Sequence, residues 1–214
     1  MPYSMEFIKP AEIETQSFAI IEAELRRRNV SCPANQMPIL QRVIHTSADF
    51  DYIQNLTFSE NAVEKALDAL RNGADIITDT NMALSGINKK SLHALGGEAH
   101  CFMSDPDVAA EAKRRGITRA MVSMEKAARL SSDNLIFAIG NAPTALIQLE
   151  QLIREHQLAP KLIIGVPVGF VNVVEAKELI LQSGVPCIVA IGNKGGSNIA
   201  AAICNALLYQ LYRA

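Results

Sequence analysis

The chain has few aromatic residues and no excess of basic charge. Tryptophan is absent, aromatic residues make up 5% of the 214 residues, and the formal net charge is -2. A nucleic-acid-binding protein usually carries a basic stripe or aromatic side chains on which bases stack, and the sequence contains neither. The basic run Arg26, Arg27 and Arg28 falls at the end of an expected helix, where positive charge complements the helix dipole. We therefore expect a solvated helix end there and no nucleic-acid partner.

Paired cysteines and long apolar runs are also missing. The four cysteines lie far apart, at positions 32, 101, 187 and 204, so no spacing typical of a zinc or redox motif occurs. Cys187 and Cys204 lie in apolar segments, where a cysteine is expected to be a small buried residue. No stretch reaches the roughly 20 apolar residues of a membrane span. Residues 1–10 lack the apolar segment of a signal peptide. These absences predict a cytoplasmic protein without a membrane partner.

Apolar residues are abundant, and their spacing alternates between two periods. Hydrophobic residues make up 49% of the chain, enough for one sizeable core in a single domain over residues 1–214. Short apolar runs predict strands at residues 74–78, 98–103, 134–139, 161–164 and 186–191. Helical spacing predicts helices at residues 11–28, 35–44, 107–115, 118–130, 143–156, 173–182 and 197–212. Ser59 is expected to cap one more helix, which ends at Gly73. The alternation indicates an α/β fold with three α/β/α layers around a mainly parallel sheet of about five strands.

Three glycine-rich segments follow expected strands. They begin at Gly140, Gly165 and Gly192, and the last one opens an alanine-rich helix at Ser197. In a parallel sheet covered on both faces, ligands bind beyond the carboxyl ends of the strands. N–H groups at a helix start favour an anion, so these segments predict a large site for a ligand with several negative groups. None matches a nucleotide-binding motif. Asp79 follows a strand at the same edge, where it either binds a ligand or caps a helix.

His45 is the titratable residue best placed for proton transfer. It lies at the end of an expected helix, three residues after Arg42 on the same helical face. Histidine changes charge near neutral pH, and an arginine beside it would attract a substrate carboxylate. A helix-end cap or a surface histidine is the competing interpretation. His93, His100 and His156 show no metal-ligand spacing, and the sequence predicts neither a metal site nor a nucleophile triad.

Five short segments occur in a distinctive order. They read SFAII from Ser17, RVIH from Arg42, AIGNAPTAL from Ala138, GVPVGFV from Gly165 and GGS from Gly195. Together they resemble the precorrin-8X methylmutase family of cobalamin biosynthesis, from about residue 6 to the C-terminus. The resemblance implies a single α/β/α domain and an isomerase that moves a methyl group from carbon 11 to carbon 12 of a corrinoid precursor. It also implies a homodimer with sites near the subunit interface and no added cofactor, because any cobalt belongs to the substrate.

The resemblance also implies roles for individual residues. The family's catalytic histidine falls on His45, which would protonate the macrocycle, and its arginine and serine contacts fall on Arg42 and Ser17. Arg119 lies where a further substrate-binding arginine is expected. The loop segments add these expected substrate contacts: Asn141, Thr144, Val168, Gly169, Lys194, Gly195, Gly196 and Ser197. The family pattern has a basic residue where this chain has Asn193, so either Lys194 supplies that charge or one carboxylate contact is lost.

A corrinoid precursor is a large apolar ring that carries carboxylates. Arginines and helix-start N–H groups suit the carboxylates, and Met82, Val166, Val168 and Phe170 are expected to form an apolar wall for the ring. The stretch that begins at His45 resembles the branch of the family that uses cobalt-precorrin-8 and forms cobyrinate. The other branch forms hydrogenobyrinate from the cobalt-free precursor. Two alternatives stay open: a non-catalytic corrinoid carrier, and an α/β enzyme that acts on a phosphorylated metabolite.

Overall fold

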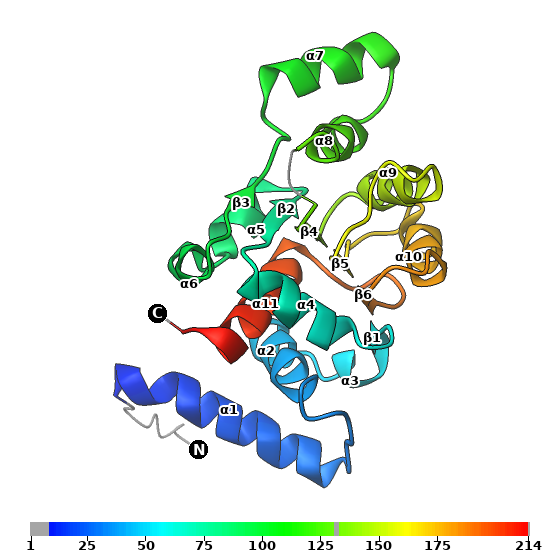
Figure 1. The fold of residues 1–214 in the computed structure, drawn as a ribbon. Helices are drawn as coiled ribbons and strands as arrows, with labels where there is room; N and C mark the ends of the chain where they lie inside the picture. Colours follow the sequence, from blue (N-terminus) through cyan, green and yellow to red (C-terminus); the bar gives the residue numbers. More distant parts are fainter. Residues whose placement is uncertain (1–8, 131–132, 214) are drawn as a thin grey trace.

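The sheet has six strands and is parallel except at one edge. The computed structural model describes residues 9–130 and 133–213. The strands are β1 (Leu56–Phe58), β2 (Asp75–Thr78), β3 (Ala99–His100), β4 (Leu135–Ile139), β5 (Leu162–Gly165) and β6 (Cys187–Ala190). They lie in the order β1-β6-β5-β4-β2-β3, as can be followed in Figure 1. Because β1 alone pairs antiparallel, the expected mainly parallel sheet is confirmed.

Two strands differ from the sequence prediction. The sequence does not predict β1, because three residues are too few for an alternating pattern to emerge. The sheet therefore has six strands instead of about five. The strand expected at residues 98–103 is confined to Ala99 and His100, because the chain then leaves the sheet for α7 (Pro106–Arg115).

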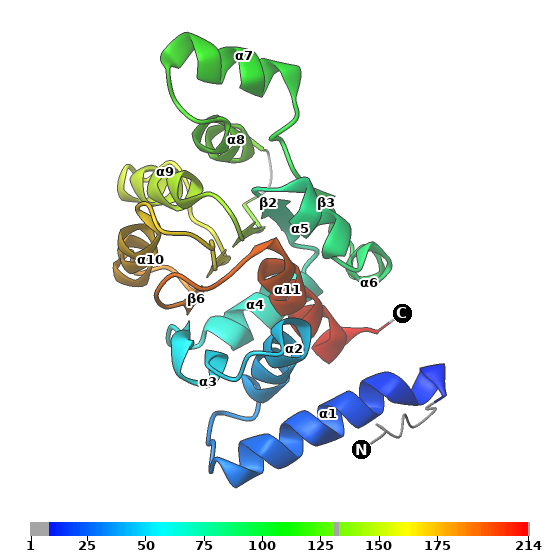
Figure 2. The ribbon, with the colours of Figure 1, turned by 180° about the vertical axis from the view of Figure 1, so that it is seen from behind.

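Helices cover both faces of the sheet, as Figures 1 and 2 show from opposite sides. One face carries α2 (Met37–Ser47), α4 (Ala62–Arg71) and α11 (Ser197–Leu211). The other face carries α8 (Arg119–Ala127), α9 (Pro143–Arg154) and α10 (Val173–Gln182). Successive strand residues enter opposite cores: Ile76 of β2 packs on the first face, and Ile77 packs on the second. The three α/β/α layers are thereby confirmed.

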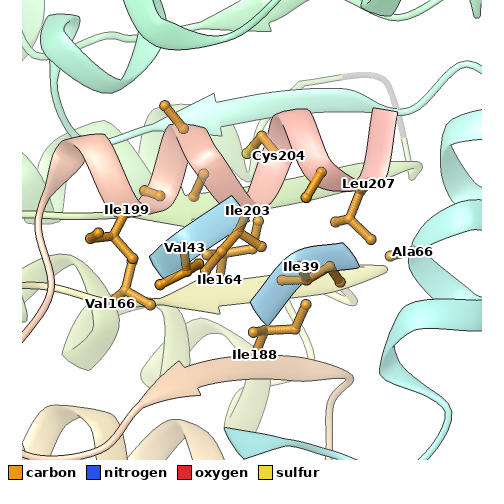
Figure 3. Close-up of a cluster of buried hydrophobic side chains, with 14 of the residues drawn as sticks. Ile39, Val43, Ala66, Ile164, Val166, Ile188, Ile199, Ile203, Cys204 and Leu207 are labelled. Carbon is orange, nitrogen blue, oxygen red and sulfur yellow. The ribbon is translucent and has the colours of Figure 1, made fainter. Parts of the chain in front are cut away.

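The larger core lies between α2, α11 and the sheet. Figure 3 shows Ile39 and Val43 of α2 beside Ile203 of α11, with Ile164 and Ile188 of the strands beneath. Helix α11 is buried along most of its length, as expected for a helix that is apolar on nearly all sides. Because α11 begins at the last glycine-rich segment, its packing fixes that segment relative to α2.

The remaining helices lie around this framework. Helix α1 (Pro10–Arg27) packs on α2 at the margin of the molecule. Three short helices are not predicted by the sequence: α3 (Tyr52–Asn55), α5 (Asn81–Gly86) and α6 (Lys89–Ala94). They have four to six residues, which is too short for a helical period to show.

The cap expected at Ser59 is wrong, whereas the helix end at Gly73 is confirmed. The N-cap of α4 is Asn61, and Ser59 Oγ instead accepts a hydrogen bond of 2.8 Å from Cys187 N. This bond joins the end of β1 to β6. At the other end, Gly73 has a φ of +73°, a conformation typical of the residue that follows a helix.

Several expectations from composition also have structural counterparts. Arg26, Arg27 and Arg28 are exposed at the end of α1, as expected for a solvated helix end. Both Cys187 and Cys204 are buried. Over residues 9–130 and 133–213, no helix combines the length and apolar character needed to cross a membrane. The first eight residues, where a signal peptide is not expected, lie outside the described part of the chain.

Candidate functional site

The glycine-rich loops meet at the carboxyl edge of the sheet, after β4, β5 and β6. A Cβ atom at Gly140 would lie 2.6 Å from Ser197 Cα, and one at Gly195 would lie 2.1 Å from Val166 O. Glycine is therefore required at both positions for the backbones to approach each other. Gly196 N donates a hydrogen bond of 2.9 Å to the same Val166 carbonyl. The three segments thus form one continuous surface, as the sequence predicts.

Asn193 joins the second loop to the third. Its Nδ2 donates to Gly169 O at 2.6 Å, and Gly169 N donates to Asn193 O at 3.1 Å. Gly169 has a φ of +148°, which residues with a side chain rarely adopt. Asn193 therefore links the two loops through both its side chain and its backbone.

A buried carboxylate lies beside the loop between β4 and α9. Asp79 is 0% exposed and accepts hydrogen bonds from Gly140 N, Asn141 N and Ala142 N at 2.9, 2.8 and 2.6 Å. Burial raises the pKa of this carboxyl above its usual value, and the three N–H donors partly oppose that rise. All three donors precede Pro143, the first residue of α9, so Asp79 anchors the loop between β4 and α9, and the helix-cap interpretation is wrong. The expectation that these N–H groups are open to an anionic ligand is wrong, because Asp79 already accepts from them.

Lys194 links the last glycine-rich loop to the segment that follows α2. Its Nζ lies 2.6 Å from Asp49 Oδ2 and 2.6 Å from Asp51 Oδ2. The ammonium holds the pKa of Asp49 below its usual value. Lys194 is expected to contact a substrate carboxylate, and here two carboxylates of the chain share its charge. These ion pairs bring the segment after His45 beside the loop.

His45 and Arg42 both contact Phe18 of α1. The rings of His45 and Phe18 are stacked, with centroids 5.0 Å apart and planes at 14°. The Arg42 guanidinium lies 4.7 Å from the centre of the same ring and forms an ion pair of 2.6 Å with Glu14. That pairing holds the pKa of Glu14 below its usual value. Ser17 is half-buried and precedes Phe18 in α1, and α1 packs on α2, the helix that carries Arg42 and His45.

Two pairs of hydroxyl groups hold Ser197 and Thr144, two further predicted site residues. Ser197 Oγ lies 2.8 Å from Thr80 Oγ1, and Thr118 Oγ1 donates to Thr144 Oγ1 at 2.9 Å. Because Thr118 caps α8, this bond places Arg119, the exposed first residue of α8, beside the start of α9. The predicted residues thus span the edge, from the side of α8 and α9 to the side of α2.

Large apolar side chains are exposed along the same edge. Five residues contribute: Met82, Val168, Phe170, Val171 and Ile191. We call them the apolar rim. Phe170 is 91% exposed, a high value for a phenylalanine. Val166 does not belong to the rim: its side chain is fully buried in the core shown in Figure 3, so its expected place in the apolar wall is wrong.

A cavity of about 640 Å³ lies at the opposite edge of the sheet. Residues that precede the strands line it, including Asn134, Lys161 and Pro186, and it contains none of the predicted site residues. Within residues 9–130 and 133–213, no group of three His, Cys, Asp or Glu side chains could hold a metal ion.

The carboxyl edge, in contrast to this cavity, combines a histidine, arginines and an open apolar rim. This combination suits a large, partly apolar anion.

Comparison with known proteins identifies the family. Residues 12–210 match the family model for precorrin-8X methylmutase. The chain belongs to the precorrin-8X methylmutase family. A methylmutase moves a methyl group within one molecule, so this member is an isomerase of cobalamin biosynthesis.

Individual relatives match over nearly their whole length. The cobalt-precorrin-8 methylmutase of Salmonella typhimurium is 46% identical, over 98% of this chain and 100% of that protein. The protein of the same name from Priestia megaterium is 43% identical, over 97% and 92%. The crystal structure of the precorrin-8X methylmutase from Thermus thermophilus has a TM-score of 0.82 at 36% identity, and covers 92% of this chain and 96% of that one.

Lys177 is a residue of this region that the sequence reasoning does not single out. It lies on α10, is 1% exposed, and donates from Nζ to Gly192 O at 2.6 Å and Lys194 O at 2.9 Å. The helical spacing in the sequence does indicate that Lys177 is buried. Val173, Ala176 and Ile180 occupy the inward face of α10, and Lys177 falls within that spacing.

Proposed function

We propose that this methylmutase converts cobalt-precorrin-8 to cobyrinate by moving a methyl group from carbon 11 to carbon 12 of the macrocycle. The names of the Salmonella and Priestia relatives favour the cobalt-containing substrate. The carbon positions follow from the family resemblance. In this proposal the cobalt belongs to the substrate, and the protein adds no cofactor of its own.

His45 is the proposed proton donor. The observation that carries this role is its setting: the imidazole stacks on Phe18, and no hydrogen-bond partner holds it within residues 9–130 and 133–213. The nitrogen atoms of the imidazole are therefore available for a proton transfer to the macrocycle. Protonation withdraws electron density from the macrocycle and lowers the barrier to migration. Because an isomer has the composition of its substrate, the donated proton returns to His45 as the product forms.

The substrate is proposed to lie across the carboxyl edge. The apolar rim suits the faces of the macrocycle, and burial of its exposed side chains by the ring would stabilise the complex. Arg42 and Arg119, on opposite sides of the edge, are the proposed partners of peripheral carboxylates, together with Ser17, Thr144 and Ser197. Exposed Asn141 and the segment from Lys194 to Gly196 complete this proposed surface.

The family resemblance supplies the rest of the proposal. We place the protein in the cytoplasm as a homodimer, with corrinoid substrate and product as its ligands and without a nucleic-acid partner. A homodimer with sites near its interface would cover part of the apolar rim that the single chain leaves exposed.

Replacement of His45 tests the mechanism. His45→Ala is expected to lower turnover of cobalt-precorrin-8 by roughly 10²–10⁴-fold, the usual contribution of a general acid, while cobyrinate still binds with nearly unchanged affinity. The matched control is His93→Ala, because His93 is exposed on α6, away from the predicted site. Full turnover by His45→Ala would remove His45 from the mechanism. A wild-type protein that binds corrinoids without turnover would instead indicate a carrier.

A further inference from the structure

Lys177 presents an unusual combination of burial and charge. The side chain is 1% exposed, and burial lowers its pKa to about 8. In the described part of the chain, its ammonium contacts backbone carbonyls, and it forms no ion pair with a carboxylate. Burial of an ammonium costs free energy, a cost that an apolar residue of similar size would not carry. The contacts of Lys177 therefore need an explanation beyond filling the core.

Both contacts of Lys177 fall on the last glycine-rich loop. The loop turns at Gly192, which has a φ of +77°, and this turn directs the carbonyls of Gly192 and Lys194 toward the ammonium. Ammonium-to-carbonyl hydrogen bonds are charge-assisted and stronger than neutral ones. Lys177 thus fixes the backbone on both sides of Asn193.

The segment held by Lys177 leads directly to the predicted ligand contacts. The side chain of Lys194 reaches Asp49 and Asp51, and the next residue, Gly195, packs against the Val166 carbonyl. Loss of the two carbonyl contacts would free the loop between β6 and α11. Its N–H groups and the Lys194 side chain would then no longer keep one arrangement.

We propose that Lys177 is a positioning residue of the substrate site: it holds the Gly192–Gly196 loop in its binding conformation and does not itself touch the substrate. This inference rests on the proposed function, because the loop is assigned to substrate binding there. It differs from a purely structural role, which predicts lower stability without a specific effect on ligand affinity.

The test compares Lys177→Met with wild type. Methionine keeps most of the side-chain length and removes the ammonium. Lys161→Met is the matched control, because Lys161 is exposed at the opposite edge of the sheet. Hydrogen exchange of a peptide covering residues 191–199 reports on the loop, absorption titration with cobyrinate reports on affinity, and thermal unfolding reports on the fold. Lys177→Gln, which keeps a donor without the charge, replaces the methionine variant if that variant does not fold.

The expected result for Lys177→Met is faster exchange in the loop and at least tenfold weaker binding of cobyrinate. Lys177→Arg, which keeps the charge, is expected to recover part of that affinity, and Lys161→Met is expected to match wild type. Unchanged exchange in the loop overturns the inference. So does faster exchange with unchanged affinity. In both cases wild type still binds cobyrinate, and the proposed function stands. A wild-type protein that binds no corrinoid contradicts the proposed function as well.

Discussion

Replacement of Asp79 by asparagine is expected to destabilise the protein and to disturb the loop that leads from β4 into α9. The carboxylate accepts three backbone N–H bonds of 2.6–2.9 Å across the carboxyl edge. Asparagine has the same shape but a single acceptor oxygen, and its amide nitrogen would face N–H donors. At least one of the three N–H groups then loses its acceptor.

The expected loss of stability follows from these contacts. The Gly140 N–H is buried, whereas Asn141 is exposed and Ala142 is half-buried, so water can satisfy their N–H groups in part. A buried N–H without a partner costs about 1–3 kcal/mol, and bonds to a charged acceptor are stronger than average. Relief from burying a charge offsets some of this loss. We expect a net decrease of roughly 1–3 kcal/mol in the free energy of unfolding.

Thermal and denaturant unfolding measure this change. For a chain of this size, 1 kcal/mol shifts Tm by about 2–4 °C, so Tm is expected to fall by roughly 2–12 °C. The matched control is Asp68→Asn, because Asp68 is exposed and forms a surface ion pair with Arg71. Such a pair contributes about 0–1 kcal/mol. Equal unfolding temperatures for the two variants would refute the assignment of Asp79 as the anchor of the loop between β4 and α9.

Three further predictions concern binding and pH. Arg42→Ala is expected to weaken cobyrinate binding in an absorption titration, because a proposed carboxylate contact is lost; unchanged affinity would contradict that contact. Phe170→Ser is expected to leave Tm within about 1 °C, since the side chain is 91% exposed, while product affinity falls; full affinity would remove Phe170 from the site. Between pH 8 and 10.5 the unfolded chain keeps the Lys177 proton that the folded protein loses. The stability of wild type relative to Lys177→Met should therefore rise with pH across this range, and a flat difference would contradict the lowered pKa of Lys177.

The sequence predicts the layered fold because its signals are local and repeated. The runs that form β2, β4, β5 and β6 are continuously apolar, as buried parallel strands require, and amphipathic helices separate most of them. Strand β1 escapes prediction because it is defined by pairing with β6, which lies far away in the sequence. The wrong cap at Ser59 has the same origin, because a contact with Cys187 replaces a local one.

The candidate site is predicted in outline, but its internal contacts are not. The carboxyl edge follows from the topology rule for parallel sheets, which locates the glycine-rich loops without knowledge of strand order. The hydrogen-bond and ion-pair partners of individual site residues depend on tertiary structure. The N–H groups of Asn141 and Ala142 look open in the sequence, and Asp79, which follows β2, accepts from them. The charges of Lys194 and Arg42 likewise have carboxylate partners within the chain.

The central claim is that the carboxyl edge binds a corrinoid, and an absorption titration of the purified protein tests it most directly. Cobyrinate and hydrogenobyrinate are each titrated against a fixed protein concentration. The account predicts a stoichiometric spectral shift with tight binding, stronger for cobyrinate than for hydrogenobyrinate. The absence of a shift with both compounds would contradict a corrinoid site at this edge.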